Sequence, residues 1–232
     1  MRFFRLKNRK DKKDILHMYE QYLSYVRDYL TEHNGIKSDV PEQTFRDRFE
    51  HTKRVIKWLD IISEGMETDR EALYLAAVFH DIGYTDRDNK DHGKRGAAIF
   101  KEFAKGEGFD DKLIEKVAYM IEQHSDKQLL GKSDSIPLEL TLLMEADQMD
   151  EEGTMRIVWD CLVAGKIGVD SFKSAYERML QFKSKMPNSM VTPRAREIWE
   201  QKSRLYNDFL AQLESDLFID DNTNIYIKKK GN

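Results

Sequence analysis

Apolar residues recur every three or four positions through most of this chain, and this period is the feature that most constrains its fold. Val55, Trp58, Leu59 and Ile62 are the clearest example. Such spacing places apolar side chains on one face of an α-helix. Four prolines and twelve glycines are few for 232 residues, which favours long helices over many-turned sheets. The pattern therefore predicts an all-α protein.

Residues that start and stop helices divide the chain into nine expected helices. Asn34 and Gly35 end the first, Asp69 is the expected N-cap of the third, and Gly83 follows its end. Residues 224–227 alone look strand-like, and the lysine-rich end after them reads as a polar tail. The expected helices are 9–33, 43–64, 69–82, 93–105, 110–124, 137–149, 152–164, 169–184 and 194–217.

Composition excludes several classes of function. The formal net charge of −4 argues against a broad basic surface for long nucleic acids. No stretch reaches the ~18 apolar residues of a membrane span, so we expect a cytoplasmic protein without a membrane partner. The single cysteine, Cys161, excludes an internal disulfide; its apolar neighbours suggest an inert thiol in the core. Tyr19, Tyr22 and Tyr25 are expected to pack within the chain.

The His80-Asp81 pair follows a nearly all-apolar helical turn, residues 75–79. An aspartate and an imidazole would be costly to bury there without partners. A metal ion in a crevice beyond the helix end would satisfy both side chains and neutralise the carboxylate. The alternative is a helix cap in which His80 contacts the last carbonyl groups.

Two further residues strengthen the metal interpretation. His51 lies mid-helix on the face of Val55, and Asp147 lies near the end of an apolar helix. Facing helices of a bundle are a known framework for such a centre. Two imidazoles and two carboxylates form a mixed nitrogen and oxygen set, which suits manganese, iron, cobalt, nickel or magnesium better than a closed structural zinc site.

The ordered set His51, His80-Asp81 and Asp147 resembles the HD-domain superfamily of metal-dependent phosphohydrolases, closest to its small bacterial hydrolases. The segment 75–83 is similar to the central helix of that family, and the resemblance covers roughly residues 45–165. It implies an HD-domain-like helical bundle in a single compact domain. Residues 1–44 would be an N-terminal helical extension, 45–165 the catalytic core, and 166–232 C-terminal helices packing on that core.

The resemblance also implies roles for His92 and His124. In two-metal members, histidines between the doublet and the last aspartate bind a second ion; in one-metal members, this region binds substrate phosphate. His92 follows His80 by twelve residues, which is short for a second-metal ligand. We therefore expect one tightly bound metal with both histidines facing the substrate, and leave a second metal open. A helix cap is the competing interpretation of His124.

The implied activity is hydrolysis of a nucleotide or related phosphate ester, as a phosphomonoesterase, phosphodiesterase or nucleotide pyrophosphohydrolase. Asp81 would bind the metal and accept a proton from the attacking water. Arg54 and Lys94 are the expected cations for the phosphoryl oxygens, Arg54 because it shares the helical face of His51. Its partner would be a small phosphorylated molecule, and a homodimer is left open.

Three other interpretations remain open from the sequence. The first is a non-catalytic HD-fold module that binds a nucleotide for regulation. The second is a structural helical scaffold without metal. The third is a di-iron oxygenase, because some helical HD-like proteins bind two irons. The segment 150–155, which departs from the small pyrophosphohydrolases, leaves the substrate undecided.

Overall fold

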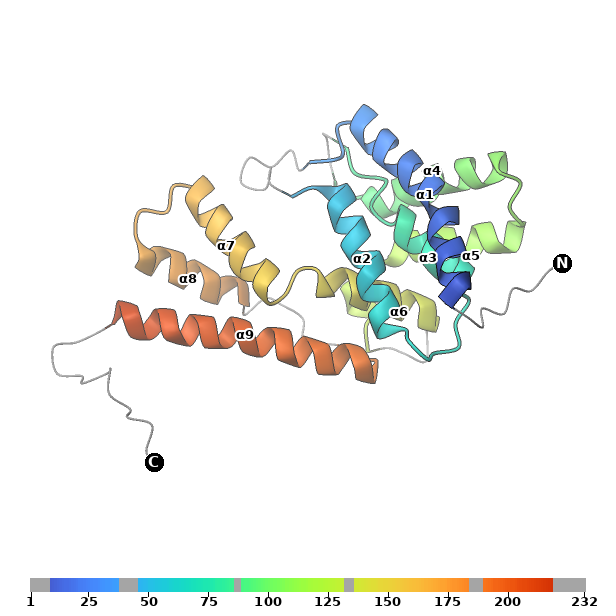
Figure 1. The fold of residues 1–232 in the computed structure, drawn as a ribbon. Coiled ribbons are helices and arrows are strands. Elements are labelled where there is room, and N and C mark those ends of the chain that lie inside the picture. The colour runs from blue at the N-terminus through green and yellow to red at the C-terminus, as the bar shows by residue number, and fades with distance from the viewer. Residues whose placement is uncertain (1–8, 38–45, 86–88, 132–135, 184–189, 219–232) are drawn as a thin grey trace. The chain divides into compact units, whose positions relative to one another are not determined.

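The computed structural model describes residues 9–37, 46–85, 89–131, 136–183 and 190–218 (Figure 1). Within these ranges it is built of nine α-helices and a 3-10 helix, η2 (Lys127–Leu129), without a strand, which confirms the expected all-α class. The strand-like segment 224–227 and the polar tail lie outside them. The helices are α1 (Arg9–Glu32), α2 (Arg48–Ile62), α3 (Arg70–Phe79), α4 (His92–Gly106), α5 (Asp111–Gln123), α6 (Leu138–Met149), α7 (Thr154–Lys166), α8 (Phe172–Lys183) and α9 (Pro193–Leu217).

Aspartate caps fix the starts of three of these helices. Asp47, Asp69 and Asp110 each accept a hydrogen bond from a backbone N–H in the first turn of α2, α3 and α5. The expected N-cap at Asp69 is therefore confirmed. The third helix ends at Phe79 rather than at Ile82, which leaves His80 and Asp81 in the turn beyond it.

The described chain divides into two compact units. Unit 1 consists of Met1–Asp150 with Ser189–Arg196, and unit 2 of Glu151–Asn188 with Glu197–Asn232. This division falls after Asp150, whereas the sequence placed a boundary at 165. The physical reason is that Ile157 of α7 packs on the apolar cluster of α8 and α9. The packing of the C-terminal helices on the core stays a prediction.

Helix α3 forms the centre of unit 1. Its residues from Ala72 to Phe79 are all buried, and α1, α2, α5 and α6 pack around it. Tyr19 and Tyr22 of α1 are buried against it, and Tyr25 lies 6.1 Å from Phe79 between ring centroids. These contacts confirm that the three tyrosines pack within the chain. The C-terminal end of α3 is thereby held in the interior.

Close backbone packing brings the start of α4 against the end of α3. A Cβ atom on Gly83 would lie 2.0 Å from the carbonyl oxygen of His92, and one on Gly93 would lie 2.7 Å from that of Glu122. Glycine is the residue that permits such approaches. They place His92 beside the ends of both α3 and α5.

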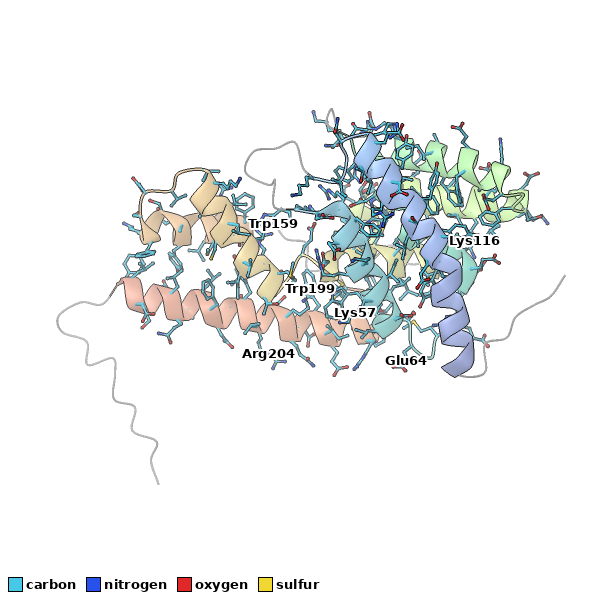
Figure 2. All side chains as sticks on the ribbon, turned by 45° about the horizontal axis from the view of Figure 1, so that its top comes forward. Lys57, Glu64, Lys116, Trp159, Trp199 and Arg204 are labelled. Atoms are coloured by element: carbon cyan, nitrogen blue, oxygen red, sulfur yellow. The ribbon has the colours of Figure 1, made fainter. Side chains whose placement is uncertain are left out.

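An ion-pair network on the surface of unit 1 ties α5 to two other helices. The Nζ atom of Lys116, labelled in Figure 2, lies 2.9 Å from the carboxylate of Asp69 and 3.2 Å from that of Glu139. Glu139 also accepts a hydrogen bond from the Asp69 backbone N–H. The starts of α3 and α6 are thus joined through one lysine of α5.

Unit 2 is a small bundle of α7, α8 and the main part of α9. Tyr176, Met179, Tyr206 and Leu210 form its buried cluster. The Tyr206 hydroxyl donates a hydrogen bond of 2.7 Å to Asp160. Burial, together with this hydrogen bond, raises the pKa of Tyr206 well above its usual range.

The expectation that Cys161 lies in the core is wrong, because the thiol is exposed. The buried face of α7 carries Asp160 and Val163 instead. Adjacent residues of a helix point about 100° apart, so Cys161 turns away from the interior together with Val158 and Leu162. In the described part of the chain, no helix has the length and apolar character needed to cross a membrane.

We predict that Gly83→Ala destabilises unit 1 by about 1–3 kcal/mol or more, because the new methyl group must displace backbone atoms of α4. Gly106→Ala, at the other end of α4 where a Cβ meets open space, is the control and should gain up to about 1 kcal/mol from helix propensity. Urea denaturation followed by circular dichroism measures both. Equal stability of the two variants would contradict the packing role of Gly83.

Candidate metal centre

Three helices bring the predicted metal ligands to one place inside unit 1. His51 comes from the first turn of α2, His80 and Asp81 follow α3, and Asp147 lies near the end of α6. The His51 Nε2 atom lies 3.4 Å from His80 Nε2, 3.7 Å from Asp81 Oδ2 and 3.0 Å from Asp147 Oδ1. Bonds from nitrogen to a metal are about 2.1 Å long, so ligands of one ion lie roughly 3–3.5 Å apart. These separations suit one shared cation.

A second group of ligand atoms meets on the other oxygen of Asp81. Its Oδ1 atom lies 3.7 Å from His92 Nε2 and 3.4 Å from His124 Nε2, and the two Nε2 atoms are 3.3 Å apart. The twelve-residue spacing between His80 and His92 does not keep them apart, because the close packing at Gly83 turns the chain back. Asp81 therefore stands between two groups of imidazoles, with one oxygen toward each.

Hydrogen bonds to the Nδ1 atoms fix how the four imidazoles are oriented. His80, His92 and His124 each donate from Nδ1 to a backbone carbonyl three residues earlier, those of Ala77, Asn89 and Ile121. His51 Nδ1 donates to the carboxylate of Asp150 at 2.7 Å. With the proton held at Nδ1, the neutral ring presents the Nε2 lone pair to the centre.

The facing lone pairs of His92 and His124 give a test of whether a cation fits. Both rings hold a proton at Nδ1, so at 3.3 Å their Nε2 atoms repel each other unless a proton or a metal ion lies between them. His124 is 1% exposed and His92 is 8% exposed, so water gives little screening. The buried Nε2 lone pair of His80 faces Asp81 Oδ2 at 3.6 Å and His51 Nε2 at 3.4 Å, which suits a cation between these atoms. The donor set therefore fits divalent ions in both groups.

Burial and neighbouring charges set the protonation of the carboxylates. Burial alone would raise the pKa of Asp81, but His80, His124 and Arg48 lower it well below its usual range. For Asp147, burial is likewise outweighed by Lys127. Both carboxylates are therefore ionised at neutral pH, as metal ligands must be.

The pKa values of three imidazoles are shifted, two downward and one upward. Burial lowers the pKa of His80 to about 4 and also lowers that of His92. Burial would lower the pKa of His51 too, but hydrogen bonds to Asp147 and Asp150 raise it to about 9. A metal bound at His51 would therefore displace the Nε2 proton.

Arg54 does not contact the candidate metal ligands directly but binds Asp150, a hydrogen-bond partner of His51. Its Nε and Nη2 atoms bond the two oxygens of Asp150 at 2.6 and 2.9 Å, and Asp150 in turn holds His51. Lys94, the other expected cation, is exposed and lies 4.0 Å from Asp91. The structure thus brings together His51, His80, Asp81, His92, His124 and Asp147, and leaves Arg54 one contact away and Lys94 at the surface.

Two cations beside the ligands were missed in the sequence. Arg48 is 4% exposed, and its Nη1 lies 3.4 Å from Asp81 Oδ2. Lys127 of η2 lies 2.5 Å from Asp147 Oδ2. Arg48 precedes His51 by three residues, and this helical spacing could have identified it as a neighbour of the site. The position of Lys127 depends on how a loop folds, which local sequence patterns do not show.

Comparisons with known proteins agree with this geometry. The sequence model of the HD domain matches residues 48–152, a range that contains all six ligand residues. A bifunctional uridylyltransferase/uridylyl-removing enzyme of Pasteurella multocida is 42% identical over 57 residues, which are 25% of this chain and 6% of that enzyme. The chain thus corresponds to a small part of that relative.

Solved structures share the fold at low sequence identity. An HD-superfamily hydrolase of Bacillus thuringiensis superposes with a TM-score of 0.62 at 18% identity, covering 87% of this chain and 97% of that one. Bacillus subtilis YpgQ in complex with ADP superposes with a TM-score of 0.58 at 21% identity, covering 87% of this chain and 95% of that one. A predicted HD superfamily hydrolase from an uncultured Thermotogales bacterium has a TM-score of 0.57 at 21% identity, covering 85% of this chain and 92% of that one. Residues 48–152 of this chain thus match the HD domain, and the solved structures share its fold.

Proposed function

We propose that this chain is a metal-dependent phosphohydrolase that cleaves a nucleotide or a related phosphate ester. One observation carries the proposal: the carboxylate of Asp81 lies between two groups of imidazoles whose lone pairs converge. A helix cap or a structural scaffold has no need of such convergence. The HD domain supports a hydrolase of this superfamily.

Two divalent ions are the cofactors that we propose. His51, His80 and Asp81 would hold one, joined by Asp147, whose Oδ1 lies 3.0 Å from His51 Nε2. Asp81, His92 and His124 would hold the other. Such ions activate a water molecule near neutral pH and neutralise charge on phosphoryl oxygens. Manganese and iron suit this mixed set of ligands. The second group of ligands favours two ions over the single tight metal expected from the sequence.

Besides the ions, the side chains of the site would hold the ions in place and stabilise charge on the phosphoryl group. Asp81, ionised and buried between the two groups, would hold an ion through each of its oxygens. Arg48 brings a buried guanidinium beside it, and its Nε atom has no hydrogen-bond partner in the described structure. A planar guanidinium matches phosphate oxygens well. We assign Arg48 the role of stabilising charge on the phosphoryl group, which the sequence had suggested for Arg54 and Lys94.

The class of substrate rests on chemistry and on the comparisons. Two ions and a buried arginine form a strongly positive site, which suits a phosphate group rather than a neutral ester. One structural neighbour, YpgQ of Bacillus subtilis, was solved in complex with ADP. We therefore propose a nucleotide substrate, and product analysis will distinguish a phosphomonoesterase, a phosphodiesterase and a pyrophosphohydrolase.

We predict that purified protein with added Mn²⁺ hydrolyses bis-p-nitrophenyl phosphate or members of a nucleotide panel, and that a chelator abolishes turnover. Asp81→Ala should lose turnover and lower the metal content, because both groups of ligands share this carboxylate. Asp111→Ala, at an exposed position of α5, is the control. Turnover that survives in Asp81→Ala would exclude the mechanism, and nucleotide binding without turnover would indicate a regulatory module.

We predict that Arg48→Gln lowers kcat by about 10²-fold while the metal content stays at the wild-type level. The reason is that the guanidinium stabilises the phosphoryl group and is not a metal ligand. Steady-state kinetics and elemental analysis measure the two effects, with the exposed Arg27→Gln as control. A parallel loss of metal would instead assign Arg48 to holding Asp81.

Arg54→Ala should show the opposite pattern. It removes both hydrogen bonds that hold Asp150, so His51 loses its fixed orientation and metal affinity should fall about 10–100-fold. At saturating Mn²⁺ the variant should recover most of its kcat. Isothermal titration with Mn²⁺ and activity against metal concentration measure this. A low kcat that excess metal does not restore would mean that Arg54 contacts the substrate.

A further inference from the structure

Tyr84 occupies a fixed position between the proposed phosphate-binding arginine and the second group of metal ligands. It follows the turn that begins at Asp81, and its backbone N–H donates to the Asp81 carbonyl at 3.1 Å. On the other side, a Cβ atom on Gly35 would lie 2.0 Å from the Tyr84 carbonyl oxygen. The backbone of Tyr84 is therefore held from both sides.

Both faces of the Tyr84 ring are covered. The Arg48 guanidinium carbon lies 3.6 Å from the ring centroid. The His92 imidazole stacks on the ring at 4.3 Å between centroids and an interplanar angle of 30°. With both faces occupied, Tyr84 has no face left on which a nucleobase could stack. The ring instead joins two residues that belong to different parts of the site.

This stack accounts for the orientation of Arg48. Its guanidinium makes a long contact of 3.4 Å with Asp81, and the Nε atom lacks a hydrogen-bond partner in the described structure. A desolvated cation over an aromatic face gains up to about 2 kcal/mol. The ring can thus hold the guanidinium in place without occupying an N–H group, and the Nε–H keeps its hydrogen-bonding capacity for an anion.

The same ring limits the freedom of His92. A hydrogen bond from Nδ1 to the Asn89 carbonyl fixes one edge of the imidazole, and the Tyr84 ring supports its face. Together they aim Nε2 at Asp81 Oδ1 and His124. Arg48 and His92, on opposite faces of one ring, therefore cannot shift independently.

We infer that Tyr84 is a positioning residue whose aromatic ring fixes Arg48 for the substrate phosphate and His92 for the second metal ion at the same time. This inference rests on the proposed function for the part that concerns Arg48. The part that concerns His92 needs only that a metal binds. The stacks involve the ring and not the hydroxyl, so phenylalanine should replace tyrosine and an aliphatic side chain of similar size should not.

The test compares Tyr84→Phe with Tyr84→Leu, with Tyr119→Leu at an exposed position of α5 as control. Calorimetric titration with Mn²⁺ alone should show two ions in wild type and Tyr84→Phe. In Tyr84→Leu the second ion should bind about 10–100-fold more weakly, as for a lost partner of a ligand, while the first ion is unchanged. Wild-type affinity for both ions in Tyr84→Leu would overturn the inference, as would an equal loss in Tyr84→Phe.

A second measurement addresses Arg48. With both ions saturating, kcat of Tyr84→Leu should fall about 10-fold or more, as expected for a misplaced group. Combined with Arg48→Gln, the two losses should not add, because Tyr84 acts through Arg48. Additive losses would overturn this part of the inference.

Two further outcomes distinguish a failure of the role of Tyr84 from a failure of the proposed phosphohydrolase activity. If wild type shows no turnover of any phosphate ester, the phosphohydrolase proposal fails, and the Mn²⁺ titration still decides the role of Tyr84 toward His92. If Tyr84→Leu does not fold, as judged by circular dichroism, Tyr84→Met and Tyr84→Phe replace the pair. A Met variant that binds the second ion like Phe would count against an aromatic requirement.

Discussion

The burial of the Asp81 carboxylate governs the rest of this structure. A charge at 3% exposure is costly unless opposite charges and hydrogen-bond donors surround it. Here the Arg48 guanidinium and the protonated His51 ring meet part of that need, and divalent ions between Asp81 and the Nε2 atoms of the other imidazoles would meet the rest. Because its two oxygens face different groups of ligands, one side chain couples the two halves of the site. Loss of this one side chain would therefore affect both halves.

The helices around Asp81 are arranged to deliver these partners. Helix α3 is buried from Ala72 to Phe79, and this anchors the turn that carries His80 and Asp81. Glycine at positions 83 and 93 lets the next helix approach until backbones touch, so His92 returns to the same centre after a short loop. The ligand geometry thus depends on backbone packing as much as on the ligands themselves.

Local signals in the sequence were sufficient for the helices and for the side chains that meet at the buried site. The apolar period and the cap at Asp69 place α2 and α3 within a few residues, and the polar His80-Asp81 pair after an apolar turn marks the buried site. Long-range packing determines the partners of the remaining residues, which local signals do not show. Arg54 was expected at the phosphate because it shares a helical face with His51, yet Asp150, 96 residues away, binds it. Cys161 was misplaced because apolar neighbours do not show which face of α7 is buried.

The hydrogen bonds at the Nδ1 atoms have a consequence for how such a centre can change over time. For His80, His92 and His124 the acceptor is a main-chain oxygen of the same turn, which no substitution of a neighbouring side chain removes. For His51 the acceptor is a side chain, Asp150, that arrives from another helix. Natural variation at position 150 can therefore adjust metal affinity gradually through His51. The other three rings keep their orientation whatever side chains surround them.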